Sequence, residues 1–234
     1  MRINKLFSNL GICSRKETNR LIEQGRVIVN GKACVAGQWV ELDEDEILID
    51  NKPIFARKKV YIALNKPVGI TCTASEETKD NIINYMNYNQ YIFPVGRLDK
   101  ASQGLIIMTN DGELANEILE AENNHEKEYL VTLNKEFDDE FIYKMSQGVE
   151  ISGIKTKPCK VERISKYMFK IILTQGLNKQ IRKMSGALGY KVIKLERIRI
   201  MNIVIDEIEY GKWRYITEKE LKALRNFKDY NLNV

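Results

Sequence analysis

A polar turn between two apolar runs governs how the middle of this chain can fold. The turn reads Gly96-Arg97-Leu98-Asp99, and the apolar runs are residues 91–95 before it and 105–108 after it. Short apolar runs bounded by turn signals are typical of buried strands. Asp99 is therefore expected between two core strands, where a carboxylate stays ionised only if cations or hydrogen-bond donors stabilise it.

Two interpretations of Asp99 follow from these residues. Arg97 lies two positions away, on the same side of an extended segment, so the pair can form a structural ion pair at a strand end. Alternatively, an ionised and partly shielded aspartate can act as a nucleophile. The turn alone favours the ion pair, and the rest of the chain has to decide.

Length and cysteine spacing limit the classes of protein to consider. A chain of 234 residues has room for one large domain, or for a small domain joined to a larger one. The cysteines Cys13, Cys34, Cys72 and Cys159 are widely spaced, and His125 is the single histidine. Because zinc and iron–sulfur sites need clustered ligands, we expect no metal site.

The amino-terminal residues and the hydropathy pattern bear on location. Residues 1–6 lack the uninterrupted apolar core of a signal peptide, and no run is long enough to span a bilayer. We therefore expect a cytoplasmic protein with reduced thiols.

The positive charge of the chain is concentrated near its start. The net charge is +5, and residues 1–32 contain seven basic residues against two acidic ones, which is the same excess. This concentration suggests a contact surface for phosphates, although a solvated helix face is the alternative. The basic residues are Arg2, Lys5, Arg15, Lys16, Arg20, Arg26 and Lys32.

The first 50 residues predict a compact unit of two helices and a small sheet. Apolar residues at helical spacing predict a helix over 2–10, and Ser14 with Glu17 forms a capping-box pattern that opens a second helix through about Glu23. The Asn30-Gly31 pair predicts a two-residue hairpin, and residues 47–49 a further short strand.

This unit resembles an S4 domain, a small RNA-binding module. The residues that carry the resemblance are Ile3-Asn4-Lys5-Leu6, Gly11-Ile12-Cys13-Ser14-Arg15-Lys16-Glu17, Leu21-Ile22-Glu23-Gln24-Gly25-Arg26-Val27 and Val29-Asn30-Gly31-Lys32. The resemblance implies that Ser14 and the seven basic residues bind RNA. A generic helix-turn-helix with a hairpin is the alternative, but it would not require so many basic residues.

The remainder predicts a larger domain of class α+β, with a mixed and mostly antiparallel sheet. Residues 51–59 are interpreted as a linker, so the domains are 1–50 and 60–234. Lys66 follows the first strand at a Pro/Gly turn, where a solvated loop charge is the ordinary interpretation. Strands are expected at 60–64, 105–108, 127–133, 160–164, 167–173, 192–195 and 198–200, and a further strand pair around Ile203 and Trp213. Helices are expected near 82–88, 114–119, 138–145 and 179–184, and a last helix after a Thr217/Glu220 capping box.

Residues 59–217 resemble the catalytic domain of an RsuA-type pseudouridine synthase. The matching motifs are Asn65-Lys66-Pro67-Val68-Gly69, Pro94-Val95-Gly96-Arg97-Leu98-Asp99 with Ser102-Gln103-Gly104-Leu105, Lys127-Glu128-Tyr129, and Gln175-Gly176-Leu177-Asn178-Lys179-Gln180-Ile181-Arg182-Lys183-Met184 with Leu195-Glu196-Arg197. Within that family, residues 123–129 and 195–202 resemble the RluF branch, which modifies large-subunit ribosomal RNA. This ordered set of motifs now favours the nucleophile interpretation of Asp99.

The resemblance implies a role for each site residue. Asp99 would be the catalytic aspartate, Arg182 the arginine that pairs with it, and Tyr129 the tyrosine that packs on the flipped base. Pairing with arginine would keep the carboxylate ionised and aimed. Substrate-binding residues implied in the same way are Arg97, Lys66, Asn178, Gln180 and Leu195, of which Arg97 would fill the space left by the extruded nucleotide and Leu195 would pack beneath the tyrosine.

Three positions depart from the family pattern. Leu177 stands where many relatives have a basic residue, and Lys179 and Lys183 replace arginines. At Lys179 and Lys183 the charge is kept, but the bidentate geometry of arginine is lost.

The predicted activity is the isomerisation of one uridine of 23S ribosomal RNA to pseudouridine, without a cofactor and by a monomer. A target atom inside a stacked helix is unreachable, so we expect base flipping. A hydrolytic glycosidase would usually need a second carboxylate facing the first, and Asp111 and Glu113 lie in a polar turn. The alternatives are the same reaction on a transfer RNA anticodon stem-loop, or on both RNAs, and a catalytically silent RNA-binding or ribosome assembly factor.

Overall fold

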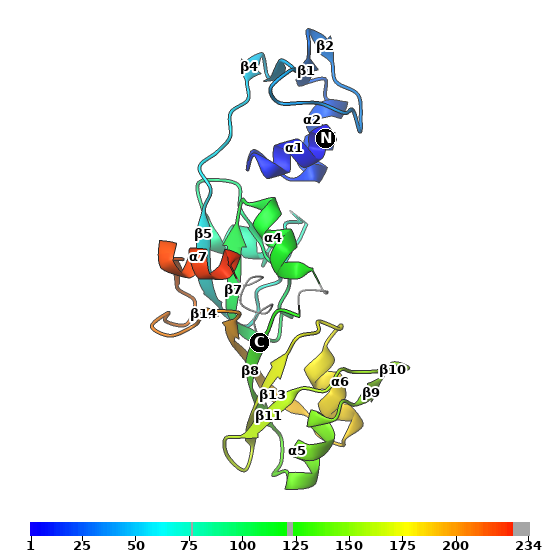
Figure 1. Ribbon diagram of the computed structural model, residues 1–234, viewed down its shortest axis with the longest axis vertical. Coiled ribbons are helices and arrows are strands. Elements are labelled where there is room, and N and C mark those ends of the chain that lie inside the picture. The colour runs from blue at the N-terminus through cyan, green and yellow to red at the C-terminus, as the bar shows by residue number, and fades with distance from the viewer. Residues whose placement is uncertain (76, 121–123, 227–234) are drawn as a thin grey trace.

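The computed structural model describes residues 1–75, 77–120 and 124–226. Asn123, at the start of one resemblance motif, and residues 227–234 at the end of the predicted second domain therefore lie outside the described residues. Figure 1 shows a small amino-terminal body above a larger, elongated one. No helix in the described segments is long and apolar enough to cross a membrane.

The amino-terminal domain packs two helices on a small antiparallel sheet of order β2-β1-β3-β4. Its own apolar cluster includes Ile3, Phe7 and Val27, all fully buried. Asn30 and Gly31 have φ of 51° and 73°, which is the conformation of a two-residue hairpin turn, so the predicted hairpin is confirmed. The elements are α1 (Ile3–Asn9), α2 (Arg15–Glu23), β1 (Val27–Val29), β2 (Lys32–Ala33), β3 (Ile47–Ile49) and β4 (Lys52–Pro53), the last within the segment interpreted as a linker.

The two bodies meet where the linker passes the start of helix α4 (Gly112–Leu119). The Asn110 side chain accepts a hydrogen bond from Val60 N at 2.9 Å and donates one to Lys58 O at 3.0 Å. Asn9 of α1 donates to Glu113 at 3.3 Å, and the Asp111 carboxylate caps α4. These contacts hold the amino-terminal domain against the turn that follows strand β7 (Gln103–Thr109).

The second domain is built on one large mixed sheet. Over the described residues the sheet has nine strands in the order β11-β12-β8-β13-β7-β5-β15, with β14 beside β13 and β6 beside β7. Most pairs are antiparallel, as the sequence predicts. The remaining elements are β5 (Tyr61–Lys66), α3 (Ile82–Met86), β6 (Phe93–Pro94), β8 (Lys127–Leu133), α5 (Asp139–Ser146), β9 (Glu150–Ile151), β10 (Ile154–Lys155), β11 (Lys160–Arg163), β12 (Met168–Leu173), α6 (Gln180–Ala187), β13 (Val192–Ile200), β14 (Ile203–Val204), β15 (Trp213–Tyr215) and α7 (Glu218–Arg225).

Two details of the predicted strands are wrong. Residues 192–200 form one continuous strand rather than two, because bulges keep the polar stretch in the ladder. Strands β14 and β15 do not pair with each other. β14 pairs with β13 and β15 with β5, so the two strands lie on different neighbours.

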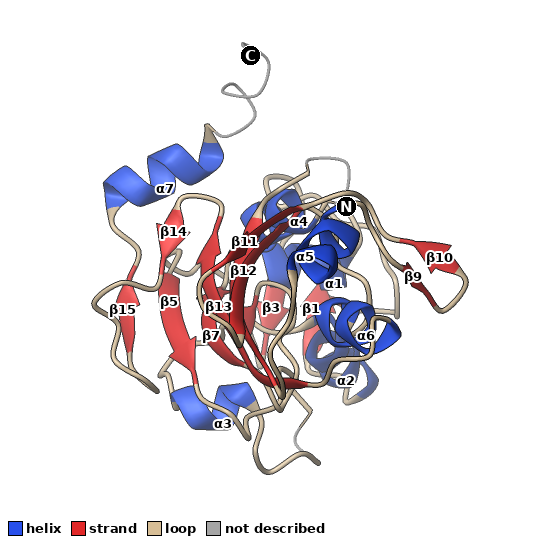
Figure 2. Cartoon of the chain, turned by 90° about the horizontal axis from the view of Figure 1, so that it is seen from below, coloured by secondary structure: helices blue, strands red, loops and turns tan. Residues whose placement is uncertain are grey.

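A short parallel pairing, here called the seam, joins the two halves of the sheet. It consists of Glu196 beside Gln103 and Arg197 beside Gly104. One half packs under α5 and α6, which lie together on one side of the sheet in Figure 2. The other half carries apolar clusters on both faces. Tyr129 packs against clusters from both halves, so the seam is also where the cores meet.

Gly104 allows the close approach of backbones at the seam. Its φ is +108°, and a Cβ built there would lie 2.3 Å from the carbonyl oxygen of Arg197. We expect Gly104→Ala to lower the free energy of unfolding by about 2–3 kcal/mol, since both the conformation and the contact become strained. Denaturant titration measures this effect.

Gly186→Ala is the matched control for this substitution. Gly186 lies within α6 and faces open space. There alanine is expected to be neutral or stabilising by up to about 1 kcal/mol. Unchanged stability of Gly104→Ala would contradict the close approach at the seam.

Helix α7 is tied to β15 through Glu220. Arg214 donates to both Glu220 oxygens at 2.7 and 2.8 Å, and Glu220 completes the predicted capping box with Thr217. The Arg214 guanidinium lowers the pKa of Glu220 from 4.5 to about 2. A carboxylate whose pKa is lower in the folded protein stabilises it above the unfolded pKa, and this contribution is lost as the pH falls.

We expect Glu220→Gln to lower the free energy of unfolding by about 1.5–3 kcal/mol at pH 7. The difference from the unsubstituted protein should shrink as the pH falls from about 4.5 towards 2, because over this range the unfolded chain takes up a proton at Glu220 that the folded protein does not bind. Chemical unfolding at several pH values measures both effects. Glu218→Gln changes an exposed carboxylate in the same turn, and an equal loss there would contradict a specific Arg214 contact.

Candidate active site

The Asp99 loop, residues 96–102 between β6 and β7, is held through its backbone. Gly69 N donates to Lys100 O at 2.8 Å, Leu98 N to Cys72 Sγ at 3.4 Å and Ser102 N to Asp99 O at 2.9 Å. The half-buried Asp99 carboxylate itself makes no hydrogen bond or ion pair with any residue that the structure describes. The loop is therefore fixed while its carboxylate stays available for reaction.

Arg182 lies beside this loop but does not pair with Asp99, so the expected ion pair is not formed. Arg182 Nη2 donates to Ala101 O at 3.0 Å and to Ser102 Oγ at 3.1 Å, and Nη1 donates to Val192 O at 3.1 Å. Helix α6 brings the guanidinium to these groups. Arg182 thus connects the end of the Asp99 loop to the half of the sheet under α6.

The interpretation of Arg97 and Asp99 as a structural ion pair is also wrong. Arg97 is exposed, and between 1 and 226 the described residues include no ion pair between Arg97 and Asp99. Strand β6 ends at Pro94, before the turn, so alternation along an extended segment does not bring the two side chains together. The ion-pair interpretation is therefore excluded, and the Asp99 carboxylate has no hydrogen-bond or ion-pair partner among the described residues.

Tyr129 and Leu195 come from β8 and β13, which pair antiparallel. In the register of β8 and β13, Tyr129 lies opposite Arg197 and Val131 opposite Leu195. Residues two apart on a strand share a face, so these four side chains lie on the same face of the sheet. Leu195 is buried, and the half-buried Tyr129 packs against the cluster that contains it.

Lys66 is not the solvated loop charge that the sequence suggested. It is 0% exposed, and its Nζ donates to Pro67 O at 2.9 Å and Ile70 O at 2.8 Å. Burial lowers the pKa of Lys66, whereas the negative charge of Asp99 acts in the opposite direction. The register of β5 places the side chain of its last residue, Lys66, in the interior. The Pro/Gly turn that follows gives no indication of this burial in the sequence.

The two residues predicted to bind substrate at the turn before α6 lie in different environments. Gln180 is buried: its Oε1 accepts from Leu177 N at 3.1 Å and its Nε2 donates to Gln175 at 3.3 Å. Gln180 therefore shapes the turn from inside. Asn178 is exposed, so its amide lies on the surface of the turn.

Sequence reasoning assigned no role to Arg197, although it quoted the residue in a motif. Arg197 is 3% exposed at the seam, with Nε donating to Leu105 O at 2.7 Å. The one sequence signal was a basic residue between apolar positions of a strand. That pattern does not show which face of β13 is covered.

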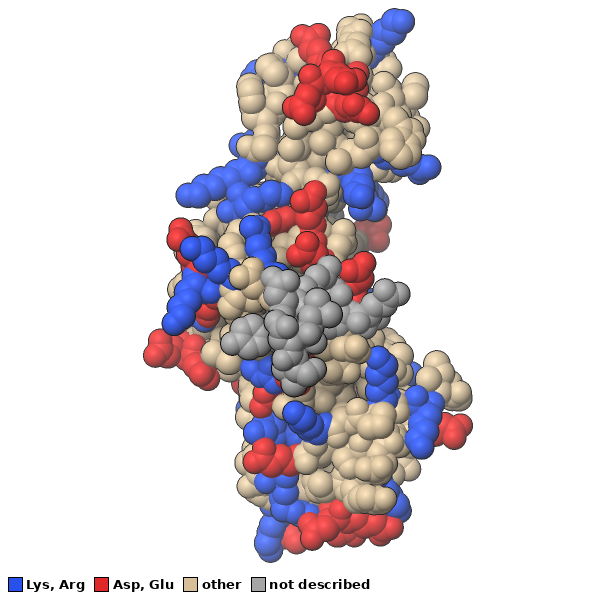
Figure 3. All heavy atoms as spheres, in the orientation of Figure 1, with Lys and Arg blue, Asp and Glu red and all other residues tan. Residues whose placement is uncertain are grey.

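The predicted RNA-binding surface of the amino-terminal domain is largely exposed. Of its residues, Arg20 pairs with Glu17 at 2.9 Å and Arg26 binds Asp50. Ser14 Oγ accepts a hydrogen bond from Glu17 N at 3.0 Å and so caps α2. Figure 3 shows acidic side chains gathered on the visible face of this domain and basic ones where the linker enters the second domain. The exposed basic residues are Arg2, Lys5, Arg15, Lys16, Arg20, Arg26 and Lys32.

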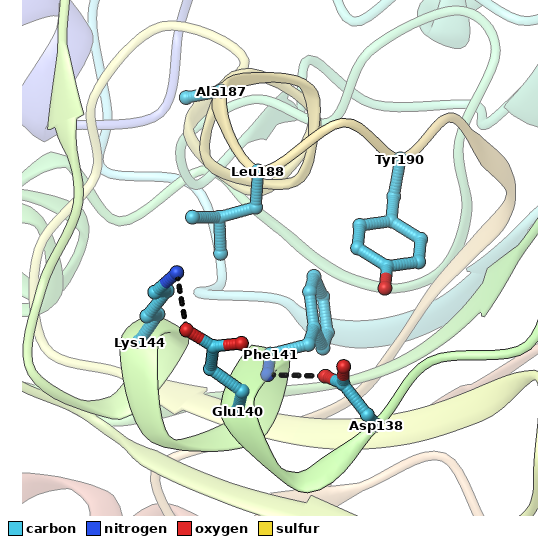
Figure 4. Close-up of a pocket in the computed structure, with 7 residues that line it drawn as sticks. All are labelled: Asp138, Glu140, Phe141, Lys144, Ala187, Leu188 and Tyr190. Atoms are coloured by element: carbon cyan, nitrogen blue, oxygen red, sulfur yellow. Dashed lines mark hydrogen bonds and ion pairs between the residues drawn. The ribbon is translucent and has the colours of Figure 1, made fainter.

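A pocket between α5 and α6 lies apart from this site and contains none of the predicted residues. Figure 4 shows that its polar groups are used locally: Asp138 caps α5 through Phe141 N, and Lys144 pairs with Glu140 at 2.7 Å. For metals, no group of three or more His, Cys, Asp or Glu side chains lies close enough within the described residues to hold an ion.

Comparison with known proteins identifies both domains. The family described as RNA pseudouridylate synthase matches residues 60–187, and the S4 domain family matches residues 1–47. A dual-specificity RNA pseudouridine synthase RluF from Salmonella typhi is 51% identical over 223 residues, covering 94% of this chain and 77% of that protein. The RluF of Escherichia coli K12 is 50% identical over 224 residues, with the same coverage.

A more distant relative and a solved structure agree with this. The ribosomal large subunit pseudouridine synthase B of Bacillus subtilis is 29% identical over 240 residues, covering 99% of this chain and 98% of that protein. A crystal structure of a pseudouridylate synthase superposes with a TM-score of 0.70 at 29% identity, covering 96% of this chain and 99% of that chain. With an S4 domain in front and a second domain that matches the family model over residues 60–187, this chain belongs to the RNA pseudouridylate synthase family.

Proposed function

We propose that this enzyme isomerises one uridine of 23S ribosomal RNA, with Asp99 as the nucleophile that starts cleavage of the glycosidic bond. The observation that carries the proposal is the unengaged Asp99 carboxylate in a loop fixed by its backbone. Pseudouridine formation breaks the bond from C1′ to N1, forms one from C1′ to C5 and moves the C5 proton, so it needs neither water nor an oxidant. A lone carboxylate suits such an isomerisation.

Residues around the loop would prepare the target nucleotide. Tyr129 offers a half-buried ring beside the seam, on which an extruded uracil can stack. Arg182 would orient the loop through Ala101 and Ser102, and a small rearrangement on RNA binding would bring it to Asp99. Arg97 and Asn178 are exposed and would contact the RNA, whereas Lys66, Gln180 and Leu195 would support the site from inside.

The domain arrangement supports a division of labour. We assign RNA binding to residues 1–50 and catalysis to residues 60–234, since each part has its own apolar cluster. The enzyme would act as a monomer in the cytoplasm, where ribosomal RNA is assembled. The dual-specificity name of the RluF relatives favours a second candidate, the same reaction on a transfer RNA anticodon stem-loop.

Asp99→Asn tests the nucleophile. We expect pseudouridine formation below about one thousandth of the wild-type rate, because the amide cannot attack, while RNA affinity stays nearly unchanged. Asp206→Asn makes the same change at an exposed aspartate and should leave the rate as it is. Full activity of Asp99→Asn would exclude Asp99 as the nucleophile.

Pseudouridine mapping in cells with and without the gene tests the substrate. Loss of a single site in 23S ribosomal RNA supports the main proposal, and an additional lost site in transfer RNA supports the dual-substrate alternative. If every site persists, the chain would instead be a catalytically silent RNA-binding or assembly factor.

Neutralising Arg15, Lys16 and Arg20 to glutamine tests the S4 surface. Each lost phosphate contact should reduce the slope of log affinity against log salt by about 0.7 to 0.9. Lys144, Lys160 and Lys191 are exposed on the second domain, and their triple substitution gives an equal change in net charge. A salt slope that falls equally in both variants would argue against a specific RNA surface on the S4 domain.

A further inference from the structure

Two buried cations, Arg197 in the seam and Lys66 beside Gly104, have no carboxylate partner within 4 Å among the described residues. Arg197 is 3% exposed and Lys66 is 0% exposed, and both donate hydrogen bonds only to backbone carbonyl groups. Burying a cation without a counter-ion is costly. A purely stabilising role therefore does not account for these two residues.

Arg197 spans both sides of the Asp99 loop with a single guanidinium group. Its Nε donates to Leu105 O at 2.7 Å in β7, and its Nη1 donates to Arg97 O at 3.5 Å. One carbonyl comes two residues before Asp99 and the other six residues after it. The planar fork of arginine can hold both at once, which a lysine ammonium does less well.

The Nη2 atom of Arg197 is buried and has no hydrogen-bond partner among the described residues. Unpaired buried donors are rare in proteins and call for an explanation. Arg197 and Asp99 act in opposite directions on the pKa of Lys66, so all three charges lie within electrostatic reach. Positive charge at this depth attracts the Asp99 carboxylate.

Lys66 acts on the same loop from the other side. Its Nζ holds Pro67 O and Ile70 O, and between them Gly69 N donates to Lys100 O at 2.8 Å. The residue after Asp99 is thus held by the turn that Lys66 organises. Two buried cations fix the two segments that meet at the reactive carboxylate.

We propose that Arg197 is a positioning residue for the isomerisation. It holds the Asp99 loop through the carbonyls of Arg97 and Leu105, and its buried charge, with that of Lys66, attracts the Asp99 carboxylate electrostatically. Arg197 is too buried to touch the substrate, so it acts through Asp99. This inference rests on the proposed role of Asp99.

Arg197→Lys tests the inference in the full-length enzyme. We expect kcat, and the rate constant measured under single-turnover conditions, to fall by about 10- to 100-fold, because small misplacement of a reacting group is costly. KM and RNA affinity should change by less than about threefold, because no RNA contact is removed. Arg197→Met, which also removes the charge, should lose more activity than Arg197→Lys, and equal losses would overturn the electrostatic part of the proposal.

Arg199→Lys is the matched control on the same strand. Arg199 pairs with Glu126 at 2.9 Å and Glu128 at 2.6 Å, not with the Asp99 loop. Its substitution should leave kcat within about threefold of wild type. If kcat falls equally in Arg199→Lys, or if Arg197→Lys leaves kcat unchanged, the positioning role is excluded.

Amide hydrogen exchange provides a readout that does not depend on turnover. In Arg197→Lys, exchange should accelerate in residues 97–105 and stay as in wild type in residues 127–133 of β8. Acceleration throughout the domain would indicate a general structural role and overturn the proposal. A wild-type enzyme that modifies no RNA would overturn the proposed function instead, while the exchange result would still decide whether Arg197 holds the loop.

Discussion

The catalytic domain depends on a parallel contact of two residue pairs between β13 and β7. Among the described residues, no other strand pairing joins the halves of the large sheet. Such a short ladder supplies few backbone hydrogen bonds, and Gly104 is required so that the backbones can approach at all. The Arg197 side chain adds a hydrogen bond to β7 next to this contact. Arg182 reaches the end of the Asp99 loop beside this contact, and Tyr129 lies opposite Arg197 on the neighbouring strand β8.

The surroundings of the seam restrain the backbone of the Asp99 loop and leave its carboxylate unrestrained. A side chain that is oriented by hydrogen bonds must break them to react, and that breaking adds to the barrier. Here the backbone of the Asp99 loop takes the restraints, from Gly69, Cys72, Arg182 and Arg197, and the carboxylate takes none of those described. Under the proposed role of Asp99, the site is organised before RNA binds, which lowers the entropic cost of reaching the reactive geometry.

Local patterns in the sequence predicted most elements, because apolar periodicity, caps and turn residues act over a few positions. The hairpin at Asn30-Gly31 and the capping box at Thr217 are confirmed for this reason. The pairing of β14 and β15, the burial of Lys66 and the partners of Arg182 were not predictable in this way. Each depends on which distant strand lies alongside, and a Pro/Gly turn or an alternating strand looks the same in either environment.

Strand β7 links the reaction site to the S4 domain. It begins at Gln103, just after the Asp99 loop, and ends at Thr109, directly before the Asn110 and Asp111 side chains that hold the linker. Because β7 is fully buried after its first residue, it transmits position rigidly from one end to the other. The distance between the basic helices and Asp99 is then set by one strand. Under the proposed function, an RNA whose phosphates and target uridine are separated by a different distance would reach only one of the two surfaces.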